Sequence, residues 1–502
     1  MAVTIDSPYY EGPGAVWLRG NLHTHSTRSD GVLPPQETIE KYRALWYDFL
    51  MLSDHDKLGE PEALDAGKML LIRGNEISAG GGHLLHVGAT RLIEPCPDRQ
   101  QVIDRINADG GLAILCHPNW QEHFNHYTYE QLLALDNYAG IEILNGTVLR
   151  LPGEARATDK WDKLLSAGKV VWGYGNDDMH KEYEPGLAWT VVRAKERSVP
   201  AVIEALRSGS CYVSSGVEIQ KIKCTGSVLH VFAPTAQAMA VFGDFGARLH
   251  YQLGNEIYFD VAELKQNYVR VECYGAAGQM AWTQPFYIRG GRAEHFRKLG
   301  EDKPVLQAQR IDREPNLSGK MDDAAWQKAQ PSTRFLNMAT GEPADAETSV
   351  RCLVTKERII FGIRCAEPQM DKIRTAVTAD GDPSTWNDDS VEIFIDAGAV
   401  KASYLHVMVS AAGYGHSCMM PDGTKGPTVQ VATSCEATGW TAEVAVPLAV
   451  FGPRADTSKE WGLHVCRNRK PTPGTYFWAW VGSSNHIPTR YGRLIFSQTT
   501  KS

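Results

Sequence analysis

Residues 21–31, NLHTHSTRSDG, close a short apolar run and place His23 and His25 two positions apart. Alternate side chains of an extended strand share one face, so both imidazoles can address a single metal ion. Similar apolar runs recur up to residue 210, and stretches with a helical pattern separate them. This alternation predicts an α/β domain built on a parallel sheet, with the carboxyl ends of its strands gathered at one edge.

Ionisable residues stand at the ends of these apolar runs. They are His23, His25, Asp54, His55, Glu76, His117, Glu142 and Asp178. Imidazole and carboxylate groups are ligands suited to zinc, manganese or iron. So many buried ionisable groups need cations to neutralise them, because unpaired buried charges are costly. The pattern therefore predicts a metal centre that makes a nucleophile from water near neutral pH.

The order of the motifs resembles one known superfamily. HTHSTRSDG, SDHD, GNE, HLLHVG, HP and DDMH follow one another as in the PHP (polymerase and histidinol phosphatase) superfamily of metal-dependent phosphoesterases, over about residues 16–215. The resemblance implies a distorted (β/α)7 TIM-like barrel with two or three divalent ions of manganese, zinc or iron. The implied metal ligands are His23, His25, Asp30, His55, Glu76, His86, His117, Asp178 and His180. The implied catalytic residues are Glu76, as the bridging carboxylate, with His55, Asp178 and His180.

Three of these ligand positions have alternatives in the sequence. His83 competes with His86, which we prefer because it directly precedes the apolar–glycine pair of the family motif. Asp177 competes with Asp178, which the DxH spacing favours. Asp30 stands at a position that varies within the family, so the resemblance leaves two or three ions open.

Four polar residues near these motifs are candidates for binding the substrate. They are Arg28, Asn119, His126 and Asn145. An arginine suits a phosphate group because it can pair with two oxygens at once. Asn145 ends the IEILN run and is therefore expected on the active face. The stretch from Asn119 to Tyr127 reads either as a mobile loop that covers the substrate or as an ordinary packed loop.

The pattern changes after the first domain, which spans residues 1–215. Residues 216–292 read as short alternating strands and predict a small antiparallel β-sandwich that packs against the barrel. Residues 293–310 are polar and predict a linker. Residues 311–502 predict a second sandwich. The expected fold is therefore multidomain, an α/β barrel followed by two antiparallel β-sandwiches.

The last domain resembles the family-9 carbohydrate-binding modules over roughly residues 311–497. LSGKMDDAAW, WNDDSVEIFID, GWTAEVAVP and WGLHVCRN carry the resemblance. It implies sugar held against flat aromatic rings, and the candidates are Trp386, Tyr404, Trp478 and Trp480. Trp386 with Asp388 and Asp389 reads alternatively as structural or as part of a Ca²⁺ site. Retained sugar binding and its loss, with the sandwich kept as a lid or dimerisation module, stay open.

Composition limits the partners and the compartment. The 502-residue chain has a formal charge of −8, and its pI is near 6.1, which disfavours long nucleic acids. No uncharged apolar run reaches 18 residues, so we expect no membrane span. The ten scattered cysteines predict free thiols and a cytoplasmic protein, with a Cys352–Cys365 disulfide as the alternative. An exported protein is the other reading, if a signal peptide has been removed.

The leading functional hypothesis is a hydrolase of phosphomonoesters or phosphodiesters of the sugar or nucleotide type, which attacks with a metal-bridging hydroxide. The same centre would serve a carboxyl or carbamate ester hydrolase equally well. A third hypothesis is a glycan-binding protein with a non-catalytic barrel. The expected partner is a small phosphoester or a glycan-linked substrate, and the sequence leaves the oligomeric state open.

Overall fold

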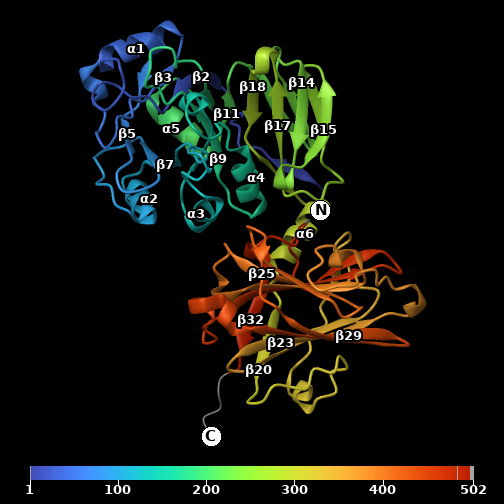
Figure 1. Ribbon diagram of the computed structural model, residues 1–502. Helices are drawn as coiled ribbons and strands as arrows, with labels where there is room; N and C mark the ends of the chain where they lie inside the picture. The colour runs from blue at the N-terminus through green and yellow to red at the C-terminus, as the bar shows by residue number, and fades with distance from the viewer. Residues whose placement is uncertain (1, 483, 498–502) are drawn as a thin grey trace. The chain divides into compact units, whose positions relative to one another are not determined.

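The computed structural model describes residues 2–482 and 484–497 (Figure 1). The chain forms two compact units, Met1–Glu294 and His295–Ser502. No helix within the described residues is both long enough and apolar enough to cross a membrane. All ten cysteines are free. The disulfide alternative is wrong because Cys352 pairs with Phe361 across the strands, whereas Cys365 pairs with Thr348.

The strands that carry the histidine motifs form two sheets of the first unit. In the first sheet β2, β3 and β4 run parallel, and in the second β7, β8 and β9 run parallel while β6 is antiparallel to β5 and β7. The bounds are β2 Val16–Asn21, β3 Phe49–Leu50, β4 Leu70–Leu71, β5 Gly74–Ile77, β6 Leu84–Val87, β7 Leu112–Leu115, β8 Gly140–Asn145 and β9 Trp172–Asn176.

Backbone hydrogen bonds connect the two sheets just beyond the strand ends. The Glu76 amide donates to the Ser53 carbonyl at 3.0 Å, and the His25 amide donates to the Met179 carbonyl at 3.0 Å. The segment after β2 thus lies beside the segment after β9, and the segment after β3 lies beside β5. The carboxyl ends of these strands are thereby brought together in one region, which is where the motif residues lie.

Four helices connect these strands, and a fifth, α5, follows β10 (Trp189–Ala194). They are α1 Pro35–Ala44, α2 Arg99–Ala108, α3 Tyr129–Ala134, α4 Thr158–Ser166 and α5 Val199–Ser208. In α4 the apolar side chains recur at helical spacing, and Trp161, Leu164 and Leu165 are buried against Ile141 and Ile143 of β8. This spacing lets one helix face pack on the sheet, as the α/β pattern predicts.

Most of the strands within residues 216–292 extend a sheet that begins in the first domain. β11 (Cys211–Ser214) pairs with β10 (Trp189–Ala194) on one side and with β18 (Met280–Thr283) on the other. Through β18 the sheet continues to β17, β14, β15, β19 and β1, while β12, β13 and β16 form a three-stranded layer of their own. Their bounds are β1 Thr4–Asp6, β12 Lys221–Thr225, β13 Val228–Phe232, β14 Ala238–Phe242, β15 Arg248–Leu253, β16 Glu256–Asp260, β17 Tyr268–Tyr274 and β19 Phe286–Arg289.

The second unit is a β-sandwich with a large apolar core and a smaller cluster around Trp326, and the expected linker belongs to its structure. Residues 293–310 contain most of α6 (Gly291–Glu301) and all of β20 (Val305–Arg310), which pairs in parallel with β22 and β32. Leu306 and Ala308 of β20 are buried in the core beside Trp440, Trp461 and Trp478. The other strands of the sheet are β21 Leu336–Asn337, β22 Thr348–Val354, β23 Arg358–Ala366, β24 Ser390–Asp396, β25 Tyr404–Ser410, β26 Gly415–Met420, β27 Thr424–Lys425, β28 Gln430–Glu436, β29 Gly439–Pro447, β30 Trp461–Arg469, β31 Gly474–Phe477 and β32 Gly492–Phe496.

Candidate metal centre

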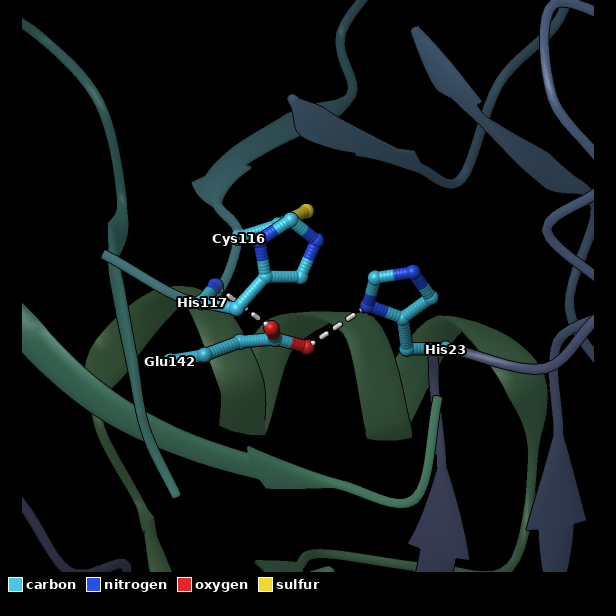
Figure 2. Close-up of side chains that lie close together, drawn as sticks. All are labelled: His23, Cys116, His117 and Glu142. Carbon is cyan, nitrogen blue, oxygen red and sulfur yellow. Dashed lines mark hydrogen bonds and ion pairs between the residues drawn. The ribbon is translucent and has the colours of Figure 1, made fainter. Parts of the chain in front are cut away.

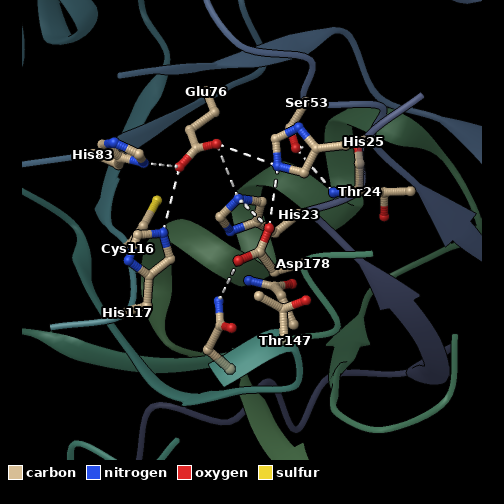
Figure 3. A network of polar contacts seen from close by, with 12 residues as sticks. His23, Thr24, His25, Ser53, Glu76, His83, Cys116, His117, Thr147 and Asp178 are labelled. Carbon is tan, nitrogen blue, oxygen red and sulfur yellow. Dashed lines mark hydrogen bonds and ion pairs between the residues drawn. The ribbon is translucent and has the colours of Figure 1, made fainter. Parts of the chain in front are cut away.

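Glu76 lies at the centre of the histidine cluster (Figure 3). It belongs to β5, is fully buried, and directs both carboxylate oxygens at imidazole nitrogens. The distances from Oε2 are 3.2 Å to His23 Nε2, 3.3 Å to His25 Nε2 and 2.9 Å to His55 Nδ1, and those from Oε1 are 2.9 Å to His83 Nδ1 and 3.5 Å to His117 Nε2. One carboxylate therefore connects two groups of imidazoles, as a bridging ligand would.

Asp178 lies opposite Glu76 across the two histidines of the HxH motif. Its Oδ1 is 3.1 Å from His23 Nε2 and 3.1 Å from His25 Nε2. Asp178 has a φ of 53° and His117 a φ of 30°, both in the left-handed region that non-glycine residues rarely adopt. Such strained positions cluster at functional sites, where surrounding structure compensates for their cost.

A third group lies around Asp30, which is about half exposed. Its Oδ2 is 3.3 Å from His180 Nε2 and 3.6 Å from His55 Nε2, and its Oδ1 is 3.6 Å from His25 Nδ1. Burial alone would raise the pKa of this carboxyl, but the imidazoles of His180 and His55 hold it well below its usual range. These four side chains can together surround one cation.

The chemistry of the donor atoms fits divalent cations. His23 Nδ1 donates to Glu142 Oε1 at 2.8 Å, so its Nε2 turns a lone pair toward two carboxylate oxygens. Lone pairs that face one another repel unless a positive charge lies between them. Buried atoms of this region without a hydrogen bond are His23 Nε2, His25 Nε2, His55 Nδ1, Glu76 Oε2, His117 Nδ1 and Asp178 Oδ1.

The same charges shift the pKa of the His23 imidazole. Burial lowers the pKa of this imidazole, but the carboxylates of Asp178, Glu76 and Glu142 outweigh burial and raise it well above its usual value. The imidazoles in turn hold the pKa of the buried Glu76 carboxyl well below its usual range. The site therefore presents negative charge that either protons or metal ions must compensate.

Glu142 orients this site and was not among the predicted ligands. Its Oε1 accepts from His23 Nδ1 at 2.8 Å, and its Oε2 accepts from the His117 amide at 2.8 Å (Figure 2). A carboxylate behind a ligating histidine fixes the ring and its tautomer. Its place in the IEILN run was the available signal, because that run ends where the histidine motifs gather.

His86 does not join the cluster, whereas His83 does. His86 is fully buried, and its Nε2 lies 3.3 Å from Asp109 Oδ2. Side chains alternate along a strand, so His86 in β6 and His83, three positions earlier, face opposite sides. The preference for His86 therefore differs from the structure, which places the His83 ring 2.9 Å from Glu76 Oε1 and near His117.

The two histidines give a direct test. We expect His83→Ala to lower metal affinity by about 10–100-fold, because the cluster would lose one donor nitrogen. We expect His86→Gln to keep the metal content and to lower the unfolding free energy by about 1–3 kcal/mol, because the buried contact with Asp109 is disturbed. Elemental analysis and urea unfolding of both variants measure these effects. The reverse pattern would assign the ligand role to His86.

The cluster lines a cavity of about 230 Å³. Among the described residues that line it, Arg150 supplies the one guanidinium, at the end of a single 3-10 turn, Thr147–Arg150, directly after β8. Its Nε donates to Glu184, which also accepts from the His180 amide at 2.5 Å. Arg28, the predicted anion ligand, lies instead 3.8 Å from Glu60.

Asn145 and Asn119 support the site from behind. Asn145 Nδ2 donates to Glu142 Oε2 at 2.8 Å and to Asp178 Oδ2 at 3.2 Å, which fixes two carboxylates. Asn119 Nδ2 donates to the Arg156 carbonyl and to Asp159 Oδ1, both at 2.8 Å. Both side chains are buried, so they position other groups and do not line the cavity.

Hydrogen bonds hold the loop from Asn119 to Tyr127 in place, although residues 121–125 are exposed. Lys160 Nζ donates to the carbonyls of Pro118, Phe124 and Tyr127 at 2.9, 2.6 and 2.6 Å. His126 Nε2 accepts from the His83 amide at 2.9 Å, and burial lowers the pKa of His126 to about 2. A neutral His126 thus holds the backbone beside a candidate ligand, and the packed reading of the loop matches these contacts.

Three of the four aromatic candidates for sugar binding are core residues. Tyr404, Trp478 and Trp480 are buried, and Trp480 stacks on Phe296 with ring centroids 4.9 Å apart. Trp386 is 51% exposed and lines a cavity of about 630 Å³. Of the four candidate rings, Trp386 alone is exposed.

Asp388 and Asp389 are satisfied by the protein itself. Asp388 accepts from the amides of Ala376 and Val377 at 2.8 and 3.0 Å, and Asp389 accepts from the Arg374 amide at 2.8 Å. These hydrogen bonds support the structural interpretation of the WNDD motif. The calcium interpretation stays a prediction.

The match to a family model lies in the second unit. Residues 317–499 match the family described as carbohydrate family 9 binding domain-like, which confirms that resemblance for the C-terminal region. No curated protein matches the chain. A solved family 9 carbohydrate-binding module from Caldicellulosiruptor kristjanssonii in complex with cellotriose is similar at 13% identity and a TM-score of 0.31, over 39% of this chain and 96% of that one.

A second solved structure is similar over more of the chain. It is a two-domain protein from Bacteroides vulgatus that contains a predicted PHP-like metal-dependent phosphoesterase, with 17% identity and a TM-score of 0.32 over 57% of this chain and 90% of that one. The C-terminal region is thus a carbohydrate family 9 binding domain-like sandwich, and it follows a unit with buried histidine and carboxylate clusters.

Proposed function

We propose that the first unit is a metal-dependent hydrolase of small phosphoesters, built on a distorted (β/α)7 barrel. One observation carries the proposal: lone-pair atoms of His23, His25, Glu76 and Asp178 converge without hydrogen bonds beside the cavity that contains Arg150. The hydrogen bonds that join the two sheets beyond the strand ends support the barrel. The superfamily resemblance of the motifs supports the chemistry.

The donor atoms divide into three groups that would each hold one ion. They are His23, His25, Asp178 and Glu76 Oε2; His83, His117 and Glu76 Oε1; and Asp30, His55 and His180. When bound, divalent cations make water nucleophilic near neutral pH and neutralise phosphoryl oxygens. His55 borders both the first and the third groups, so loss of its imidazole would disturb two sites.

The remaining residues of the cavity bind and orient the substrate. The Arg150 guanidinium would pair with a phosphoryl oxygen, and Glu184 holds it toward the cavity. Trp120 and Leu151 line the wall and exclude water from the reacting group. A volume of about 230 Å³ accommodates a small ester rather than a long polynucleotide, in keeping with the net charge of −8.

A carboxyl or carbamate ester is the second candidate substrate. Arg150 already pairs with Glu184, and Val148 and Leu151 make part of the wall apolar. An arginine that is charge-compensated attracts a phosphate dianion less strongly than a free one does. The two substrate classes share the metal centre, and the assay below separates them.

Metal-stripped protein reloaded with Mn²⁺, Zn²⁺ or Fe²⁺ should hydrolyse phosphoesters in a panel that also holds carboxyl and carbamate esters. We expect His25→Ala and Asp178→Ala to abolish this turnover, because each removes a ligand of the first group. His250→Ala, an exposed histidine of β15, is the matched control and should keep activity. Turnover of carbonyl esters alone would favour the second candidate, and metal-independent turnover would refute the proposal.

We propose in addition that the second unit binds sugar through Trp386. The exposed ring offers one flat apolar face, and the polar groups of Glu392 and Asn468 line the same cavity. We expect Trp386→Ala to weaken binding of glucose or cello-oligosaccharides at least tenfold in isothermal titration calorimetry. Trp46→Ala, at an 87% exposed tryptophan of the first unit, should have no effect. Unchanged binding in Trp386→Ala would exclude this ring as the sugar platform.

A further inference from the structure

Soft donor atoms gather on one face of the hairpin formed by β25 and β26. The two strands pair so that Tyr404 lies opposite Met420, His406 opposite Cys418, and Met408 opposite His416. Alternate residues of each strand share a face, so these six side chains lie together. Five of the six line the cavity of about 630 Å³ in the second unit, together with Met338 and His486.

The Cys418 sulfur lies close to two further donor atoms of this group. Cys418 Sγ lies 3.9 Å from His406 Nδ1 and 3.9 Å from Met420 Sδ. Two sulfur ligands about 2.3 Å from one metal are roughly 3.8 to 4.0 Å apart at tetrahedral or trigonal angles. The separation of the Cys418 and Met420 sulfurs therefore matches that of two sulfur ligands around a common ion.

The hydrogen bond behind His406 leaves the required nitrogen available. His406 Nε2 lies 2.8 Å from Glu392 Oε2 and donates to it, which makes Nδ1 the lone-pair nitrogen that faces Cys418. His406 is 6% exposed, and its ring stacks on Phe394 with centroids 4.2 Å apart. A carboxylate that fixes the far nitrogen of a histidine is the arrangement found behind metal-bound imidazoles.

The donor types select the ion. Thiolate and thioether ligands favour soft cations such as Cu(I), whereas oxygen ligands favour Mg²⁺, Ca²⁺ and Mn²⁺. We propose that Cys418 Sγ, Met420 Sδ and His406 Nδ1 form a binding site for Cu(I) in the second unit. Binding converts the Cys418 thiol to a thiolate and releases its proton to solvent, and the copper keeps its oxidation state.

The test uses the full chain under anaerobic conditions, with Cu(I) as the probe and bicinchoninate as the competing chelator. Cys418→Ser and Met420→Leu should each lower the Cu(I) affinity at least tenfold. Two matched controls should keep it: Met419→Leu, whose side chain points to the other face of β26, and Cys435→Ser, an exposed thiol of β28. Met420→Leu nearly conserves volume, so its loss of affinity would reflect the missing thioether.

X-ray absorption of the Cu(I)-loaded protein gives an independent measurement. We expect two sulfur neighbours at about 2.3 Å and one nitrogen neighbour at about 2.0 Å. Wild-type affinity in both Cys418→Ser and Met420→Leu, or a copper shell without sulfur, would overturn the proposal. These readouts do not involve ester hydrolysis, so their failure would leave the proposed function of the first unit untouched.

Discussion

Glu76→Gln is expected to abolish hydrolysis and to remove metal from the first unit. The amide keeps the volume of the side chain but cannot supply two anionic oxygens to the imidazole groups on either side. Metal ions contribute several kcal/mol to such reactions, and about 4 kcal/mol corresponds to roughly a thousandfold in turnover. Steady-state kinetics and elemental analysis of the same preparation measure both losses.

Glu62→Gln is the control for this change. Glu62 is an exposed carboxylate that pairs with Arg73 at 2.6 Å, so the substitution removes the same charge at the surface. Wild-type metal content and turnover are expected for it. A Glu76→Gln protein with full metal content and activity would show that Glu76 does not bridge metal ions.

The second large effect concerns stability. Asp162 of α4 accepts from Arg270 of β17 through both oxygens, at 2.7 and 2.6 Å, and from the Tyr268 hydroxyl at 2.8 Å. Arg270 is 1% exposed. Asp162→Ala would leave the Arg270 guanidinium buried with Glu272 as its remaining carboxylate partner. Breaking a buried pair costs about 3–5 kcal/mol. Urea unfolding should show a fall of this size.

The triple variant Asp162→Leu, Arg270→Met and Glu272→Gln separates charge from packing. It removes the buried pair together with the carboxylate that Arg270 Nη1 contacts at 2.7 Å, and hydrophobic replacements of a buried pair are often neutral in stability. We expect it to recover most of the lost unfolding free energy. A triple variant as unstable as Asp162→Ala would mean that packing, rather than the unpaired guanidinium, causes the loss.

The order of strands and helices in the first unit could be predicted, because the spacing of apolar residues along the chain reflects which face of each element is buried. The reversed direction of β6 was missed, although its signal is in the sequence. Residues 78–83 between β5 and β6 are too few for a crossover helix, so they require an antiparallel pair. The strand β20 was missed because polar residues alternate with its inward Leu306 and Ala308.

The candidate site was predictable where a motif stands at the end of a strand, and less so elsewhere. His83 and His86 have the same chemistry, and they differ only in the face of the strand to which each side chain points. Arg150 follows β8 by a single turn, and an isolated arginine in a loop carries no periodic signal. The aromatic candidates were misplaced because the sequence gives their size and not their burial: Trp478 and Trp480 serve the core.

The pairing of β11 with β18 determines which fragments of this chain can fold on their own. A fragment that stopped at residue 215 would expose the β11 edge, with its unpaired amides and carbonyls, to other chains. It would be prone to aggregate even with every predicted metal ligand present. The smallest fragment that folds independently is therefore expected to extend to about residue 294. Recombination during evolution should preserve that boundary rather than the end of the histidine motifs.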